Sequence, residues 1–128
     1  MTQLSTESRN WSMLAHFSAA LAQLLLPSFG FLGPLLVWLL KRKDADVAHH
    51  ARQAFAFQLA MALSVWILGL IGTALSCFVV GWVLYVAALA PWLAALVLPV
   101  LAGIRVNNGE DYAYPITGPM VPRRLPGR

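Results

Sequence analysis

The feature that most constrains this chain is the absence of charge over two long stretches. No Asp, Glu, Lys or Arg occurs in residues 11–40, a run of 30 residues, or in residues 53–104, a run of 52. A helical crossing of the bilayer core needs about 20 apolar residues. The second run is therefore long enough for two crossings, and the first for one crossing or a short hairpin. This distribution excludes a soluble globular domain, a disordered chain and a disulfide scaffold.

The composition agrees with this placement of charge. Apolar residues make up 59% of the chain and charged residues 11%, whereas an average soluble domain is roughly 25% charged. Cys77 is the only cysteine, so no disulfide can form within the chain, and no neighbouring cation activates its thiol. We expect an all-α integral membrane protein, a compact bundle of three or four transmembrane or re-entrant helices.

The first apolar segment is interrupted. Residues 11–26 would form a helix of about 24 Å, at 1.5 Å per residue, and residues 35–40 resume the apolar pattern. The stretch between Pro27 and Pro34 holds two prolines and two glycines, which a straight helix does not accommodate. The segment is either one kinked crossing or, as we favour, a hairpin of two short helices. The side of the N-terminus stays open.

Two long helices are predicted after this break. Asp44 or Asp46 can cap the first of them, which runs over residues 47–76. The last crossing covers residues 81–104. Small residues recur every four positions on both helices, as faces that allow close helix packing, namely Ala56, Ala60, Ser64, Ala90 and Ala94.

The last helix contains residues that should bend it and residues that should end it. Pro91 and Pro99 lie inside it and should kink it. Asn107, Asn108 and Gly109 follow it, and they favour a helix stop because Asn and Gly tolerate the left-handed conformation. The chain then divides into a polar N-terminus (1–10), a helical membrane domain (11–109) and a Pro-rich basic tail (110–128), which we expect to be extended.

Positive charge predicts the orientation. Lys and Arg favour the cytoplasmic side of a membrane, and residues 76–81, between the last two crossings, have no charge. We predict a multi-pass protein of the bacterial inner membrane with the loop 41–52 and the C-terminal tail in the cytoplasm. The basic residues concerned are Lys41, Arg42, Lys43, Arg52, Arg105, Arg123, Arg124 and Arg128.

Polar side chains in the apolar segments define a candidate site. His16 and Gln23 lie on one face of the first helix, at helical spacing, and Gln58 lies on the next helix. Polar groups in hydrocarbon seek partners inside the bundle, so we expect these three residues to form an interior cluster. The cluster could be a path for protons or solutes. Structural hydrogen bonds between helices are the interpretation that we favour.

No chemical motif stands out elsewhere in the chain. Asp44, Asp46, His49 and His50 are the only residues that resemble a metal site, but adjacent histidines diverge on a helix and no closed ligand spacing is present. Helix capping is the favoured interpretation of the carboxylates. We find no phosphate-binding loop and no nucleophile with a base, and therefore predict no enzyme activity, metal, cofactor or small-molecule substrate, and no nucleic-acid binding.

Several short motifs in order carry a resemblance to a known family. They are residues 11–16 (WSMLAH), 33–41 (GPLLVWLLK), 50–54 (HARQA), Phe57-Gln58 and residues 107–115 (NNGEDYAYP). Together they resemble a family of small bacterial membrane proteins of unknown function, distantly similar to the twenty-kilodalton Tic component of chloroplast protein import. The resemblance covers residues 11–117. It implies an integral helical fold and supplies no biochemical activity.

Two functions follow as hypotheses. The first is a non-enzymatic interaction subunit or assembly partner in the bilayer, as a homo-oligomer or with another membrane protein. It rests on the missing catalytic groups, the small-residue faces and a candidate interaction signature, namely Asn107, Asn108, Gly109, Glu110, Tyr112, Tyr114 and Pro115. The alternative is a channel or translocation component related to Tic-type import, which rests on the polar stripe, the kinked helices and the resemblance.

Overall fold

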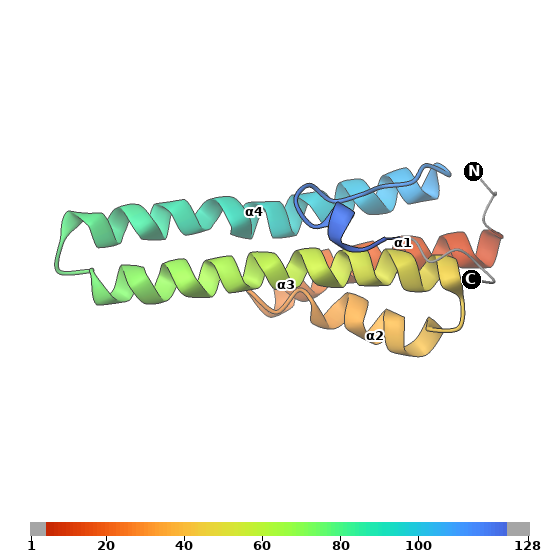
Figure 1. The fold of residues 1–128 in the computed structure, drawn as a ribbon, viewed down its shortest axis with the longest axis horizontal. Helices are drawn as coiled ribbons and strands as arrows, with labels where there is room; N and C mark the ends of the chain where they lie inside the picture. Colours follow the sequence, from red (N-terminus) through yellow and green to blue (C-terminus); the bar gives the residue numbers. More distant parts are fainter. Residues whose placement is uncertain (1–4, 123–128) are drawn as a thin grey trace.

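The structure, a computed structural model, describes residues 5–122, which form an all-helical bundle (Figure 1). The elements in chain order are α1 (Thr6–Leu25), α2 (Leu32–Lys41), α3 (Ala45–Ala74), α4 (Val79–Asn107) and the short 3₁₀ helix η1 (Gly118–Met120). The predicted compact bundle is confirmed, with four α-helices in the described range. The first apolar segment takes the form of a hairpin, α1 followed by α2.

The N-terminal boundary differs from the prediction. Helix α1 begins at Thr6, inside the segment that we expected to be a polar N-terminus outside the helical domain. Ser5 is its N-cap, and the Ser5 side chain accepts a hydrogen bond from the Ser8 backbone N–H at 3.1 Å. This bond satisfies one of the free N–H groups of the first turn, and Glu7 in the same turn suits the positive end of the helix dipole.

The break between α1 and α2 is shorter than its prolines suggest. Helix α1 ends at Leu25 and α2 starts at Leu32, so that Pro34 belongs to the first turn of α2. A proline is tolerated there because its missing N–H would have no partner within the helix. Gly33 lies so close to α1 that a Cβ atom would strike the Ser18 backbone, which fixes how tightly the hairpin closes.

Helices α3 and α4 form a longer hairpin, and α1 and α2 cover only about half of it (Figure 1). Both long helices are long and apolar enough to cross a membrane. In their most apolar windows only 28% and 11% of the residues are buried in the bundle, whereas a core helix of a soluble protein is mostly buried. The remaining apolar surface therefore faces lipid.

Charge is confined to one end of the described molecule. The start of α1, the α2–α3 turn and the end of α4 lie together at that end, and the α3–α4 turn lies at the opposite end (Figure 1). Every charged residue between 5 and 122 belongs to these segments, to the adjoining turns of α3 or to residues 110–111 just after α4, and residues 75–78 at the opposite turn carry none. One end of the bundle is therefore charged and the other is not, so the two sides of a membrane would face different surfaces of the protein.

The C-terminal segment is not the extended tail that its composition predicts. Residues 110–122 fold back over the bundle (Figure 1), with Tyr114, Thr117 and Gly118 buried. The Gly118 N–H donates to the Tyr114 carbonyl at 2.9 Å, which closes this segment into a compact loop. Burial of an aromatic ring outweighs the extended preference of the prolines here. The tail arginines Arg123, Arg124 and Arg128 lie outside the described residues.

Candidate functional site

A buried polar network joins three parts of the chain at the charged end. His16 of α1 contacts Tyr114 of the C-terminal segment, with 2.8 Å between Nδ1 and the phenol oxygen. Its other ring nitrogen, Nε2, lies 3.2 Å from Nδ1 of His50 in α3. All three side chains are at most 1% exposed. The network therefore ties α1, α3 and the C-terminal segment together where water is excluded.

Local structure explains how Tyr114 reaches this position. Helix α4 ends in a Schellman motif, in which the Gly109 N–H donates to the Val106 carbonyl and the Glu110 N–H donates to the Arg105 carbonyl, both at 3.0 Å. Gly109 has a φ of +81°, a conformation that glycine adopts at little cost. The motif reverses the chain direction and sends residues 110–114 back along the bundle.

The ring of Tyr114 is held as firmly as its hydroxyl. It stacks on Phe57 with ring centroids 4.4 Å apart and an interplanar angle of 15°. The Tyr114 N–H donates to the side-chain oxygen of Gln53 at 3.4 Å. Burial raises the pKa of Tyr114 well above its usual value, and the neighbouring Tyr112 adds to this shift. The phenol therefore stays protonated and can act as a hydrogen-bond donor.

The outer edge of the network carries an acid. His50 Nε2 lies 3.7 Å from a carboxylate oxygen of the half-exposed Asp111. A protonated Tyr114 that donates to His16 leaves His16 free to donate to His50, whose remaining N–H then points to Asp111. One consistent set of donors and acceptors thus runs from the buried phenol to the surface carboxylate.

A shallow cavity of about 370 Å³ lies beside this edge. His49 and Gln53 of α3 form one wall, and their side chains contact each other at 3.2 Å between the two Nε2 atoms. Tyr112 also lines the cavity. Its ring lies beside the Arg105 guanidinium, with 5.7 Å between the guanidinium carbon and the centre of the ring. Burial raises the pKa of Tyr112, and the Arg105 charge opposes that shift.

A second polar contact lies deeper in the bundle. Gln58 of α3 donates from Nε2 to the Ala95 carbonyl of α4 at 2.6 Å. In a regular helix this carbonyl would accept from residue 99, four positions later, but Pro99 has no N–H. Gln58 therefore supplies the donor that Pro99 removes. Such replacement partners are what allow proline inside a helix in the bilayer.

The predicted cluster of His16, Gln23 and Gln58 divides into these two places. All three side chains are buried. Gln23 and Gln58, however, lie together at the α1–α2 turn, where the side-chain oxygens of both occupy the place that a Cβ atom on Gly30 would take. His16 belongs instead to the network with His50 and Tyr114. Neither partner of His16 was predicted from the sequence, although His50, Ala54, Phe57 and Met61 are spaced four, three and four residues apart, as residues on one buried helix face are.

The residues of the predicted interaction signature serve mostly within the chain. Asn107 is the last residue of α4 and Asn108 is its C-cap, and the two residues that follow complete the Schellman motif. Tyr114 is fully buried rather than displayed, and Pro115 precedes Ile116, which has a φ of +71°. The exposed members are Asn107, Asn108, Gly109, Glu110 and Pro115.

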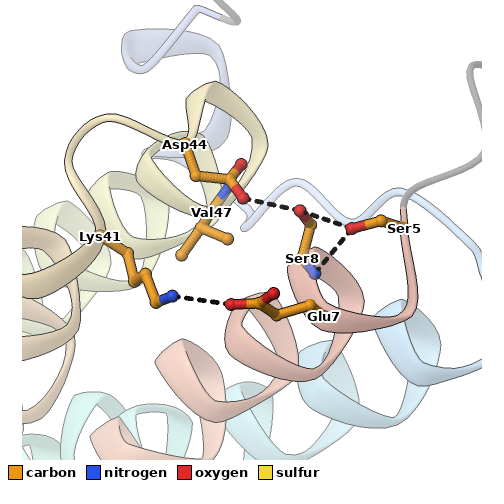
Figure 2. Close-up of polar contacts among 6 residues, drawn as sticks. All are labelled: Ser5, Glu7, Ser8, Lys41, Asp44 and Val47. Carbon is orange, nitrogen blue, oxygen red and sulfur yellow. Dashed lines mark hydrogen bonds and ion pairs between the residues drawn. The ribbon is translucent and has the colours of Figure 1, made fainter.

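The four residues considered as metal ligands in the sequence, Asp44, Asp46, His49 and His50, make different contacts in the structure. Asp44 is the N-cap of α3 and accepts from the backbone N–H groups of Asp46 and Val47 at 3.1 and 3.2 Å. Figure 2 shows that it also accepts from the Ser8 hydroxyl, at 2.6 Å, which links α3 to α1. One to two turns further along α3, His50 lies in the buried network and His49 lines the cavity beside it with Gln53. Within residues 5–122, no three His, Cys, Asp or Glu side chains gather to hold a metal ion.

Comparison with known families identifies the group to which this chain is related. A family model described as the magnetosome magnetite crystal formation protein family matches residues 7–121. The chain belongs to that family. Neither a curated protein nor a solved structure matches the chain.

This match corrects the resemblance to a Tic-like family of unknown function, which was wrong. The motifs that carried it include a Gly-Pro helix start and an Asn-Asn-Gly helix stop. Such motifs satisfy backbone requirements of any helical hairpin, so they say little about descent. The matched stretch also includes the segment after α4, in agreement with its packing onto the bundle.

Removal of the Tyr114 hydroxyl tests the network. Tyr114→Phe keeps the stack on Phe57 but leaves a buried His16 nitrogen without its donor, so we expect the free energy of unfolding in detergent to fall by about 1–3 kcal/mol. Amide hydrogen exchange in residues 110–122 should also become faster. Tyr112→Phe is the matched control, with an expected change within about 0.5 kcal/mol. Equal losses in both variants would contradict the role assigned to the hydroxyl.

A double-mutant cycle tests the contact between Gln58 and the Ala95 carbonyl. Gln58→Leu removes the side-chain N–H that donates to the Ala95 carbonyl, and we expect the free energy of unfolding to fall by about 1–3 kcal/mol. In a Pro99→Ala background the helix regains its own N–H at this carbonyl, so the same change should cost clearly less. Thermal or denaturant unfolding of the four proteins measures the coupling. If Gln58→Leu costs the same in both backgrounds, the replacement of the proline donor is refuted.

Proposed function

We propose that this chain is a non-enzymatic subunit of the magnetosome membrane that supports magnetite crystal formation through contacts with lipid and partner proteins. The observation that carries this proposal is the family match over residues 7–121. The family description names both the compartment and the process, and the two apolar helices that face lipid are consistent with a membrane subunit.

The use of the polar side chains favours an interaction role over a catalytic one. His16, His50 and Tyr114 are the best candidates for proton transfer, and they are taken up by contacts with one another. Gln58 is taken up by a backbone carbonyl of α4. Hydrogen bonds of this kind hold helices together in a bilayer.

The distribution of charge favours an orientation. Positive residues prefer the cytoplasmic side, so we place the charged end of the bundle there. All five carboxylates of the chain share that end, namely Glu7, Asp44, Asp46, Glu110 and Asp111. The opposite side then presents only the uncharged α3–α4 turn. A crystal enclosed on that side would meet no carboxylate of this protein, so its effect on the crystal would be exerted through the membrane and its partners.

Deletion of the gene in the bacterium that produces this chain tests the function. We expect magnetite crystals of altered size or number, with recovery when the wild-type chain is restored, measured by electron microscopy. A His50→Asn variant that accumulates to the wild-type level should also restore them, because a subunit without chemistry needs the fold rather than this imidazole. Unchanged crystals in the deletion strain would refute the function, and failure of a normally accumulated His50→Asn protein would refute its non-enzymatic nature.

The native cysteine allows a direct test of the orientation. Cys77 is the only cysteine of the chain and is exposed at the α3–α4 turn. In isolated magnetosomes, whose outer surface is the cytoplasmic one, a membrane-impermeant maleimide should label Cys77 only after detergent is added. The control is Lys43→Cys in a Cys77→Ser background, which places the thiol at the charged end and should be labelled at once. The reverse pattern would invert the proposed orientation.

A further inference from the structure

A small basic cavity lies where α2 ends and α3 begins. It measures about 220 Å³ and is lined by Trp38, Arg42, Lys43, Ala45, Ala48 and Arg52. Three of these six residues are cations and none is acidic. At about 30 Å³ per water in the liquid, the cavity has room for roughly seven waters. It can therefore admit a phosphate group, which has five non-hydrogen atoms.

The carboxylates near this cavity are directed toward α1 instead. Glu7 pairs with Lys41 at 2.9 Å, and Asp44 accepts from Ser8 and from the backbone at the start of α3 (Figure 2). These contacts join α1 to the α2–α3 turn. Asp46, in the first turn of α3, is not among the residues that line the cavity. The wall of the cavity itself therefore holds three cations and no carboxylate.

One further feature favours an anion in this position. Arg52 donates from Nε to the Ala48 carbonyl at 3.3 Å. That bond holds the guanidinium group beside the cavity wall, so that less side-chain entropy is lost when an anion binds.

The surroundings indicate that the anion comes from a lipid. Leu36, Leu39 and Leu40 of α2 are 59%, 60% and 63% exposed, and Leu39 and Leu40 line an adjacent cavity that shares Arg42 and Lys43. Trp38 packs on Phe55 with 6.2 Å between ring centroids and lines the cavity at the same level. Tryptophan favours the level of the lipid headgroups. The cavity thus lies where acyl chains would meet the leucines and a headgroup would meet the cations.

We propose that this cavity binds the phosphate of an anionic phospholipid, with Arg42, Lys43 and Arg52 around the phosphate and the acyl chains against α2. The site lies at the charged end, apart from the His16 network, and does not depend on the proposed role in crystal formation. It would fix the depth of the α1–α2 hairpin in the bilayer and link the protein to regions rich in acidic lipid.

Native mass spectrometry of the full chain in detergent tests this site. The probes are phosphatidylglycerol and phosphatidylcholine, which share a phosphate but differ in net charge. We expect the wild-type protein to retain phosphatidylglycerol preferentially. Arg42→Gln/Lys43→Gln should lose about 30-fold in affinity, since each basic residue near a headgroup contributes roughly fivefold. Both side chains are exposed, so this variant is expected to fold, which circular dichroism verifies.

The matched control removes the same charge from the same end. Lys41→Gln/Arg105→Gln alters two cations that do not line the cavity and should keep the preference to within a few-fold. Equal retention of the two lipids by the wild-type protein would overturn the proposal. An equal loss in the control would reduce it to general charge attraction and so overturn the site. Displacement of the lipid by excess inorganic phosphate, or binding of phosphate alone, would show a site for free phosphate and overturn the lipid assignment.

Discussion

The bundle depends on the pairing of polar groups inside a structure that is surrounded by lipid. A buried donor or acceptor without a partner in the protein is costly there, because water does not satisfy it. The contact of His16 with both His50 and Tyr114 meets this requirement for three separate elements at once. It fixes α1 against α3 and draws the segment after α4 onto the bundle. This one imidazole therefore contacts two of the elements that pack together with α1 at the charged end.

The same requirement explains the deeper part of the molecule. Pro99 in α4 would leave the Ala95 carbonyl unsatisfied in hydrocarbon, and Gln58 of the neighbouring helix supplies the missing donor. Gly30 lets the α1–α2 turn approach that same glutamine, because any larger side chain would collide with it. Gln58 of α3 thus contacts both the turn between α1 and α2 and the carbonyl in α4 that Pro99 leaves without a donor.

The asymmetry of the bundle connects the fold to the proposed function. Short helices cover the long hairpin only at its charged end, which leaves the other half of α3 and α4 as a two-helix hairpin in lipid. Carboxylates, basic residues and the polar network all gather at the covered end. A member of the magnetosome magnetite crystal formation family with this architecture would exert its effect from the charged face and through the bilayer. The basic cavity beside α3 would supply a defined contact with acidic lipid on that face.

The sequence by itself determined the class of the protein and the existence of its long helices. Two uncharged runs bounded by charged residues admit few arrangements, because charge is expensive in hydrocarbon and helix length is set by bilayer thickness. The caps at Asp44 and Gly109 were also readable, since they depend on local backbone geometry alone. The polar character of His16, Gln23 and Gln58 in apolar segments marked all three as interior residues.

Only the tertiary structure decided which of those groups meet. His16 pairs with residues 34 and 98 positions away, and no local pattern specifies such partners. Tyr114 lies in a segment whose prolines predict an extended chain, yet burial of its ring on Phe57 and its bond to His16 fold that segment back. The partner of Gln58 is a backbone carbonyl freed by a proline 41 positions away in sequence, from 58 to 99. Spacing along a helix determines which face a residue occupies, but packing between helices determines what that face contacts.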